Sequence, residues 1–366
     1  MPKTQSRAVM NWILAFGSFA VFLVVYGGFV RLTRSGLSIV EWNPVMGVVP
    51  PLTQPAWQME FEKYQLSPEY RQINFDMTLE QYQEIFSIEW LHRTLARLAG
   101  LLFAVPFFVF LLTKKIPWRE AGLYVVMGAL FLAQAIMGWL MVASGLVDQP
   151  AVSHFLLTAH LFLALSLIGL SLWTALGHHY GFPNQPGKRH WSAGSRAVLV
   201  GLLALLIQMA YGGFTAGLKA GHVSDTWPLM LGHWIPGGLL SQVEPVLANL
   251  VSAPLTVAWF HRWFAVAILV CAFVIYRAVD RRMGGAELAK GVGLLLALTT
   301  LQIGLGIAVV LSHVEIGLAL LHQLNAIGLF TVMIFLLHRL RSQDHVGPAK
   351  LGSGPSTAEF AGRIDA

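Results

Sequence analysis

Two short stretches of the chain carry the same set of chemically active residues. The first reads EWLHR from Glu89 and the second reads AWFHR from Ala258. Tryptophan, histidine and arginine recur in register, whereas the glutamate of the first copy is replaced by alanine in the second. Residues three apart on a helix are neighbours, so Glu89 and His92 share one face. An ionisable pair at the start of a membrane-length apolar run predicts a functional site, because burying charge in lipid is costly.

Two further histidines, His160 and His322, lie in later apolar runs at corresponding places. A haem iron needs only two imidazole ligands, and no Asp, Glu or Cys cluster completes a zinc or di-iron site. The pattern therefore predicts that His92 pairs with His160, and His261 with His322, each pair holding a haem iron between two helices. The alternative is that these histidines are hydrogen-bond partners between helices. His154 and His313 have no duplicated context and are interpreted as structural, and His222 and His233 lie in the outer loop between the fifth and sixth runs with no role assigned.

The charged neighbours of these histidines each have two explanations. Arg93, Arg97 and Arg262 either pair with haem propionates near the outer surface or extend to the lipid headgroups. Glu89 is either an interfacial glutamate favoured by the helix dipole or a catalytic carboxylate one turn from an iron ligand. Because the second copy keeps its histidine but has Ala258, we favour a catalytic Glu89. The first half then carries the reactive site and the second half a permanent haem.

The composition indicates a polytopic membrane protein. Hydrophobic residues make up 56% of the chain and charged residues 11%, against roughly 25% charged in soluble domains. The net charge of +6 does not indicate nucleic-acid binding, because the basic residues collect at the ends of apolar segments. With Cys271 as its single cysteine, the chain can form neither an intramolecular disulfide nor a thiolate cluster.

Eight apolar runs are long enough to span a bilayer. They cover approximately residues 8–30, 89–113, 121–147, 151–177, 197–218, 258–276, 291–311 and 316–337. With eight spans both termini lie on one side, which carries sixteen Lys and Arg residues against five on the other. The excess of positive charge predicts that both termini face the cytoplasm. No secretory signal precedes the first run, which favours a bacterial inner membrane.

An internal repeat divides the spans into two sets of four. YGGF from Tyr26 recurs from Tyr211, and Gln134 with Gly138 recurs as Gln302 with Gly306. We therefore predict an all-α polytopic membrane protein of two pseudo-symmetric parallel four-helix bundles. The N-terminal bundle covers residues 1–177, a cytoplasmic linker 178–196, the C-terminal bundle 197–341 and a disordered tail 342–366. The first outer loop, 31–88, is long enough to be functional or partly ordered.

Three other classes of protein compete with an enzyme of this kind. A bis-histidine cytochrome b that exchanges electrons with quinone explains four histidines, but not the loss of the glutamate in one half. A transporter predicts broken helices and polar residues at the midplane, whereas the polar groups here gather near one surface. A purely structural assembly factor needs no ionisable residue inside the bundles.

The motifs together resemble the haem A synthase family, in its proteobacterial and mitochondrial branch. In the first half these are YGGFVRLTRSGLSIVEWNPVMGVVPPL from Tyr26, EWLHR from Glu89, and AHL from Ala159. In the second half they are YGGFTAGLKAG, DTWPLM, WFHRW and LHQLNA, which start at Tyr211, Asp225, Trp259 and Leu321. The resemblance covers about residues 12–341. Some members carry a cysteine pair in an outer loop, which this chain lacks.

The resemblance implies oxidation of the C8 methyl group of haem O to a formyl group, which yields haem A. It places the substrate haem at His92 and His160 with Glu89 essential, and a haem b between His261 and His322. It also implies haem O synthase and the cytochrome oxidase assembly factors as partners. The oligomeric state stays open, a homo-oligomer included.

Overall fold

The computed structural model describes residues 6–43, 46–147, 150–183, 191–279 and 285–344. Eight helices in this part of the chain are long and apolar enough to cross a membrane, which confirms the predicted spans. They are α1 (Arg7–Leu32), α4 (Leu79–Leu112), α5 (Gly122–Gly145), α6 (His154–Tyr180), α7 (Ala193–Gly217), α9 (Pro254–Ala278), α10 (Gly285–Leu311) and α11 (Ile316–Gln343). Apart from one isolated bridge between Met230 and His233, the described residues are helices, turns and loops. The chain is an all-α, multi-pass membrane protein.

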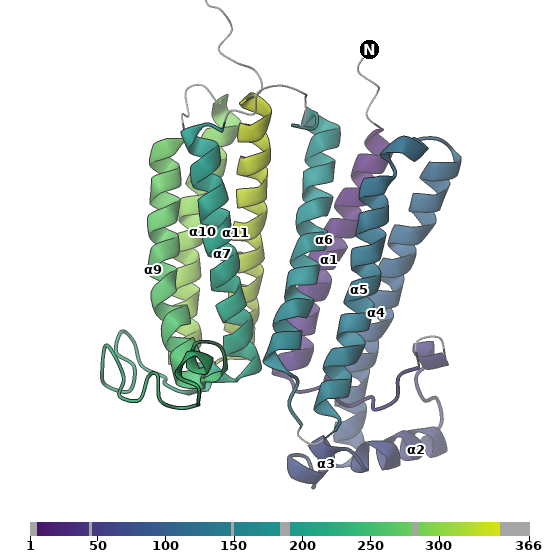
Figure 1. Cartoon of the computed structure of the whole chain (residues 1–366). Coiled ribbons are helices and arrows are strands. Elements are labelled where there is room, and N and C mark those ends of the chain that lie inside the picture. The colour runs from purple at the N-terminus through teal and green to yellow at the C-terminus, as the bar shows by residue number, and fades with distance from the viewer. Residues whose placement is uncertain (1–5, 44–45, 148–149, 184–190, 280–284, 345–366) are drawn as a thin grey trace, which may run out of the picture.

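The long helices lie in two groups (Figure 1). The first group contains α1, α4, α5 and α6, and the second contains α7, α9, α10 and α11. The groups meet where α1 and α6 pack against α7 and α11. At this interface Gln323 donates to the Val24 carbonyl at 2.9 Å, and Arg31 donates to the Ala216 carbonyl at 3.0 Å. The first helix begins and the last helix ends at the same end of the molecule (Figure 1).

The first outer loop is more helical than the sequence predicted. It contains the short 3-10 helix η1 (Met46–Val48), then α2 (Gln54–Gln65) and α3 (Pro68–Gln72). α4 begins at Leu79, not near Glu89, because Thr78 and Gln81 form a capping box at its start. Its first turns are polar, so the apolar run in the sequence does not include them. Glu89 therefore lies inside the helix and not in its first turn.

The outer helices pack on α4 through an aromatic cluster. Phe61, Tyr64, Tyr82 and Phe86 are buried in it. The rings of Tyr64 and Tyr82 stack with centroids 5.0 Å apart. This packing fixes the outer helices of the N-terminal half against the start of α4 (Figure 1).

The remaining short elements lie between the long helices. η2 (Trp118–Glu120) precedes α5, and η3 (Ala220–His222), η4 (Val246–Ala248) and α8 (Asn249–Ser252) lie in the second outer loop. The ends of the predicted linker are helical, since α6 reaches Tyr180 and α7 begins at Ala193. Most of the predicted tail, from residue 345 onwards, falls outside the described residues, as does 184–190 of the linker.

Candidate functional site

In each of the four predicted ligands, the same ring nitrogen lacks a hydrogen-bond partner. His92 lies on α4, His160 on α6, His261 on α9 and His322 on α11. The Nδ1 atom of every one of these rings is buried and has no hydrogen-bond partner. Buried polar atoms in proteins are almost always paired, so four such atoms at duplicated positions require an explanation. A haem bound between the two rings of each pair is an explanation that fits these unpaired atoms.

Each imidazole lies against a glycine of the neighbouring helix. A Cβ atom on Gly27 would stand 3.3 Å from Cε1 of His92, and one on Gly212 would stand 3.2 Å from Cε1 of His261. The same contact recurs on the other pair of helices, where Gly138 faces His160 at 3.3 Å and Gly306 faces His322 at 3.1 Å. The absence of a side chain lets each ring approach the helix backbone. These matching contacts support the predicted repeat.

The C-terminal pair has a separation suited to a single iron. The ring centroids of His261 and His322 are 6.3 Å apart, with the planes at 77°. Metal–imidazole bonds of about 2 Å on opposite sides of one ion would place the centroids roughly 6 Å apart. Nowhere in the described residues, this pair included, do three His, Cys, Asp or Glu side chains gather as a metal site. Two imidazoles with a planar macrocycle between them fit this donor set.

Side-chain amides surround the C-terminal pair. Gln208 donates to the backbone carbonyl of His261 at 2.9 Å, and Gln302 donates to that of His322 at 3.0 Å. The Gln302 oxygen accepts from Asn325 at 2.6 Å. In the N-terminal half the corresponding glutamine, Gln134, has a buried Oε1 without a hydrogen-bond partner. Gln208 likewise has a buried Oε1 without a partner, so the two halves differ at Gln302, whose amide nitrogen and oxygen are both bonded.

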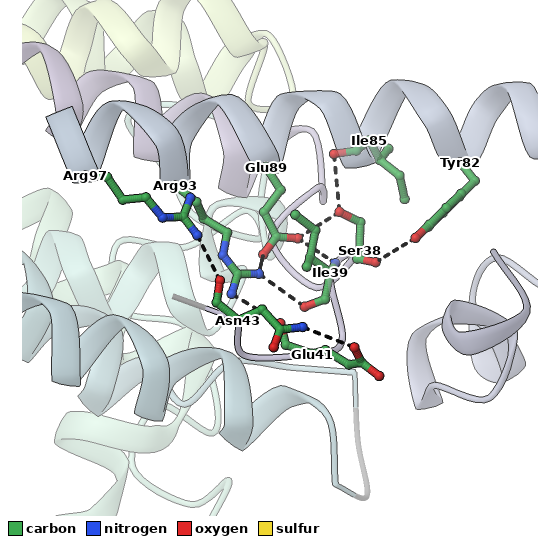
Figure 2. Close-up of polar contacts among 9 residues, drawn as sticks. All are labelled: Ser38, Ile39, Glu41, Asn43, Tyr82, Ile85, Glu89, Arg93 and Arg97. Atoms are coloured by element: carbon green, nitrogen blue, oxygen red, sulfur yellow. Dashed lines mark hydrogen bonds and ion pairs between the residues drawn. The ribbon is translucent and has the colours of Figure 1, made fainter. Parts of the chain in front are cut away.

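Glu89 is buried beneath the segment that follows α1 (Figure 2). Only 3% of the residue is exposed. Its Oε2 accepts from the Ser38 hydroxyl at 2.7 Å and from the Ile39 N–H at 2.9 Å, and Oε1 lies 3.4 Å from Nη1 of Arg93. A buried carboxylate is tolerated only when such donors compensate its charge. Glu89 is therefore not a glutamate of the first helical turn: it lies well inside α4, its side chain is buried, and three donors hold it.

Arg93 and Arg97 hold the same outer segment (Figure 2). Arg93 donates to the backbone carbonyls of Ile39 and Glu41, both at 3.4 Å, and its guanidinium lies 5.4 Å from the Trp42 ring centroid. Arg97 donates to the Asn43 carbonyl at 3.2 Å. Each arginine therefore binds the backbone of the segment that covers Glu89.

Arg262 makes the corresponding contacts in the second half. It donates to the carbonyls of Ser224 at 2.6 Å and Thr226 at 3.0 Å. Ile39 and Ser224 both lie thirteen residues after the tyrosine of their YGGF motif, and Glu41 and Thr226 both lie fifteen after it. The recurring arginine is thus a clamp on the outer segment in both halves, a role that sequence reasoning missed. Pairing of these arginines with haem propionates stays a prediction.

The recurring tryptophans act in the same way. The indole N–H of Trp90 donates to the Val48 carbonyl at 3.1 Å, and that of Trp259 donates to the Trp234 carbonyl at 2.8 Å. The duplicated Trp-x-His-Arg pattern therefore combines one candidate ligand with two donors that fasten the outer loop above it.

Comparison with known proteins shows the family of this chain. The family model described as cytochrome oxidase assembly protein matches residues 10–334. The chain belongs to this family. A relative named Heme A synthase from Parvibaculum lavamentivorans is 38% identical over 340 residues, which is 92% of this chain and 96% of the relative. Proteins of the same name from Nitrosospira multiformis and Flavobacterium johnsoniae are 42% and 36% identical, over 92% of this chain and 94% and 99% of their own lengths.

In this member of the cytochrome oxidase assembly family, the site also contains residues that were not predicted from the sequence. Ser38 and the Ile39 N–H bind Glu89, and Tyr82 donates from its hydroxyl to the Ser38 carbonyl at 3.3 Å. One signal was available, because the position that matches Ser38 in the second half is Val223. The donor and the acceptor are therefore both replaced by apolar residues in the half that lacks the carboxylate.

A second buried carboxyl group, Glu69 on α3, lies in the outer region of this family member. Its Oε2 accepts from the Tyr64 hydroxyl at 3.3 Å, and that hydroxyl also accepts from Asn74 at 2.7 Å. Burial raises the pKa of Glu69 from 4.5 to about 7. The negative charge of Glu89 acts in the same direction, whereas the Tyr64 hydrogen bond and the charges of Arg34 and Lys219 act against it. Glu69 therefore titrates near neutral pH.

We expect the outer helices to become less stable as the pH rises from about 5 to 7. The packed state binds the Glu69 proton more tightly than the opened state, so opening is favoured once that proton is lost. A pKa raised by this amount corresponds to about 3 kcal/mol. Hydrogen–deuterium exchange of residues 54–72, corrected for the intrinsic rate, should show this trend. Glu69→Gln should abolish it and Glu62→Gln, an exposed residue on α2, should retain it; a pH-independent wild type would contradict the prediction.

Proposed function

We propose that this chain is a haem A synthase that oxidises the C8 methyl group of haem O to a formyl group. Its family membership and its relatives named Heme A synthase support this proposal. The reaction makes the protein an oxidoreductase. The substrate haem binds in the N-terminal group of helices, with His92 and His160 as its iron ligands.

The observation that carries the proposal is the buried Glu89 site. A carboxylate with three donors lies one helical turn from a histidine whose Nδ1 has no partner. The equivalent position beside His261 is Ala258, which is 3% exposed and packs among apolar residues. An electron carrier with two equivalent sites has no use for this difference, whereas an enzyme with one reactive site does.

Oxidation of a methyl group to a formyl group adds one oxygen atom and removes four electrons; with water as the oxygen source, R–CH3 and H2O give R–CHO, four protons and four electrons, and the electrons pass to an external acceptor. In our proposal Glu89 either accepts a proton or stabilises positive charge that develops as the methyl is oxidised. Ser38, Ile39 and Arg93 fix the carboxylate, so that it does not reorient during the reaction. His92 and His160 would orient the macrocycle of the substrate haem.

We propose that His261 and His322 hold a resident haem b. When bound, haem b supplies one-electron transfer. The amides of Gln208 and Gln302 tie both histidine backbones to neighbouring helices, which suits a group that is kept through many turnovers. Gln134, the counterpart of Gln302, is bonded less completely, which suits a substrate that must enter and leave.

A glycine pair on α10 tests the haem b site. Gly306→Val should push the His322 ring away and lower the haem b content, because the new side chain would overlap Cε1. Gly304→Val is the matched control, since nothing lies within 4 Å of a Cβ atom there. The measurement is the b-type absorbance per protein in reduced-minus-oxidised spectra. Equal haem content in the two variants would contradict the assignment of His322.

The proposal includes a location and partners. The chain resides in a bacterial inner membrane with both termini in the cytoplasm, because sixteen Lys and Arg residues lie on that side. Haem O synthase supplies the substrate, and cytochrome oxidase assembly factors receive the product. Glu89 and its partners then lie near the outer face.

A bis-histidine cytochrome b that exchanges electrons with quinone is the alternative, and the spacing of His261 and His322 fits it equally well. Pigment extraction separates the two functions. Protein purified from cells that supply haem O should contain haem A together with haem b if it is a synthase. Haem b alone, with haem O unconverted under any electron acceptor, would favour the carrier.

A further inference from the structure

Ser38 occupies a special place beside Glu89. It is fully buried in the segment that follows α1. Its Oγ lies 2.7 Å from Oε2 of Glu89 and 3.3 Å from the carbonyl oxygen of Ile85, one turn earlier on α4. The hydroxyl thus has two acceptors on one helix face, the closer of which is the carboxylate (Figure 2).

The internal repeat shows that this pair is exchanged as a unit. Ser38 lies twelve residues after Tyr26, and the residue twelve after Tyr211 is Val223. Val223 packs against the apolar cluster that contains Ala258, the counterpart of Glu89. The arginine clamp on the same segment is nevertheless kept in both halves. The backbone arrangement therefore does not require a serine or a glutamate, and their joint presence belongs to the chemistry of one half.

The backbone of Ser38 is held from two sides. The Tyr82 hydroxyl donates to the carbonyls of Ser38 at 3.3 Å and of Glu60 on α2 at 3.2 Å. On the other side, Arg93 donates to the carbonyl of Ile39. Tyr82 itself is 1% exposed in the aromatic cluster. The hydroxyl of Ser38 is consequently presented to Glu89 by a rigid support, which is what a preorganised site needs.

We propose that Ser38 is a positioning residue for the reaction, whose hydroxyl fixes the Glu89 carboxylate in the orientation required for methyl oxidation. This inference rests on the proposed role of Glu89. Ser38 acts through Glu89 and need not touch the substrate. Its second acceptor, the Ile85 carbonyl, leaves the hydroxyl a hydrogen bond whenever Glu89 carries a proton.

Substitutions at Ser38 and a matched control at Ser35 test the role of Ser38. Ser38→Ala and Ser38→Val, the latter with the residue of the second half, should lower haem A formation per bound substrate haem by roughly ten- to hundredfold, the effect of one hydrogen bond to a charged group. Ser38→Thr keeps a hydroxyl and should restore most of the rate. The matched control is Ser35→Ala. Ser35 is also fully buried, and the corresponding residue of the second half is also apolar, Ala220. The Ser35 hydroxyl, however, forms a hydrogen bond with Thr33 and not with Glu89.

Three readouts are measured on the full chain in membranes: haem A formed, substrate haem bound and the haem b spectrum. The haem b spectrum reports folding independently of the N-terminal site. We expect Ser38→Ala to keep bound substrate and haem b while conversion falls. If it loses the b spectrum, Ser38→Cys, which keeps the volume and weakens the hydrogen bond, should show the same fall in conversion with haem b retained.

Several outcomes would overturn the inference. Wild-type conversion in Ser38→Ala, with conversion lost in Glu89→Gln, would remove Ser38 from the reaction and leave the proposed function intact. An equal loss in Ser35→Ala, or no rescue by threonine, would show a general effect on the loop. Wild-type conversion in Glu89→Gln would instead overturn the role of Glu89 on which the inference rests.

Discussion

Glu89→Gln should reduce haem A formation by about 100-fold or more, the usual contribution of a general acid or base. Glutamine nearly preserves the volume and still accepts hydrogen bonds, but it neither carries charge nor takes up a proton at neutral pH. Haem O should therefore accumulate in the purified protein, bound but unconverted. The ratio of haem A to haem O in extracted pigment measures the effect.

The control for this substitution lies on the same helix. Glu84 is exposed on α4, so Glu84→Gln should leave haem A formation unchanged. Haem b absorbance should stay at the wild-type level in both variants, because the C-terminal site is separate. If Glu89→Gln made haem A at the wild-type rate, Glu89 would be a structural residue and the mechanism would have to be abandoned.

His261→Ala should eliminate the haem b signal. Its imidazole is paired with that of His322, whose ring centroid lies 6.3 Å away. Without this imidazole, His322 alone would remain to hold a haem in the C-terminal group. Reduced-minus-oxidised spectra measure the result, and haem A formation should fall with the loss of the resident haem.

Two histidine controls separate ligation from burial. His338 on α11 is fully buried, packs edge-on against Trp173 at 4.8 Å and has no hydrogen-bond partner for either ring nitrogen. His338→Gln should nevertheless keep haem b, because within the described part of the chain the ring contact of His338 is with Trp173 and not with a second histidine. His92→Ala should keep haem b and lose substrate haem. A b-type signal that survived in His261→Ala and vanished in His338→Gln would overturn the assignment.

Much of the membrane architecture follows from local patterns in the chain. Eight apolar runs predicted eight spanning helices, and the structure contains all eight. Hydropathy succeeds here because every backbone group in lipid must be satisfied within its own helix. The predicted start of α4 was wrong by about ten residues, because the first turns of this helix are polar and lie outside the apolar run. The outer helices α2 and α3 were not predicted, because they contain no apolar run of membrane-spanning length.

In the candidate site, too, some features were predicted from the sequence and others were determined only by the tertiary structure. The sequence alone selected Glu89 and the four histidines, because duplication exposes both what recurs and what differs between the halves. The partners of Glu89 were decided by the tertiary structure. Ser38 and Ile39 are about fifty residues away along the chain, and only the folding of the outer segment over α4 brings them within 3 Å of the carboxylate. The arginines show the same limit, since their acceptors are backbone carbonyls that carry no signal in residue type. Residue types determine which groups can react, whereas the contacts that orient them depend on packing between distant segments.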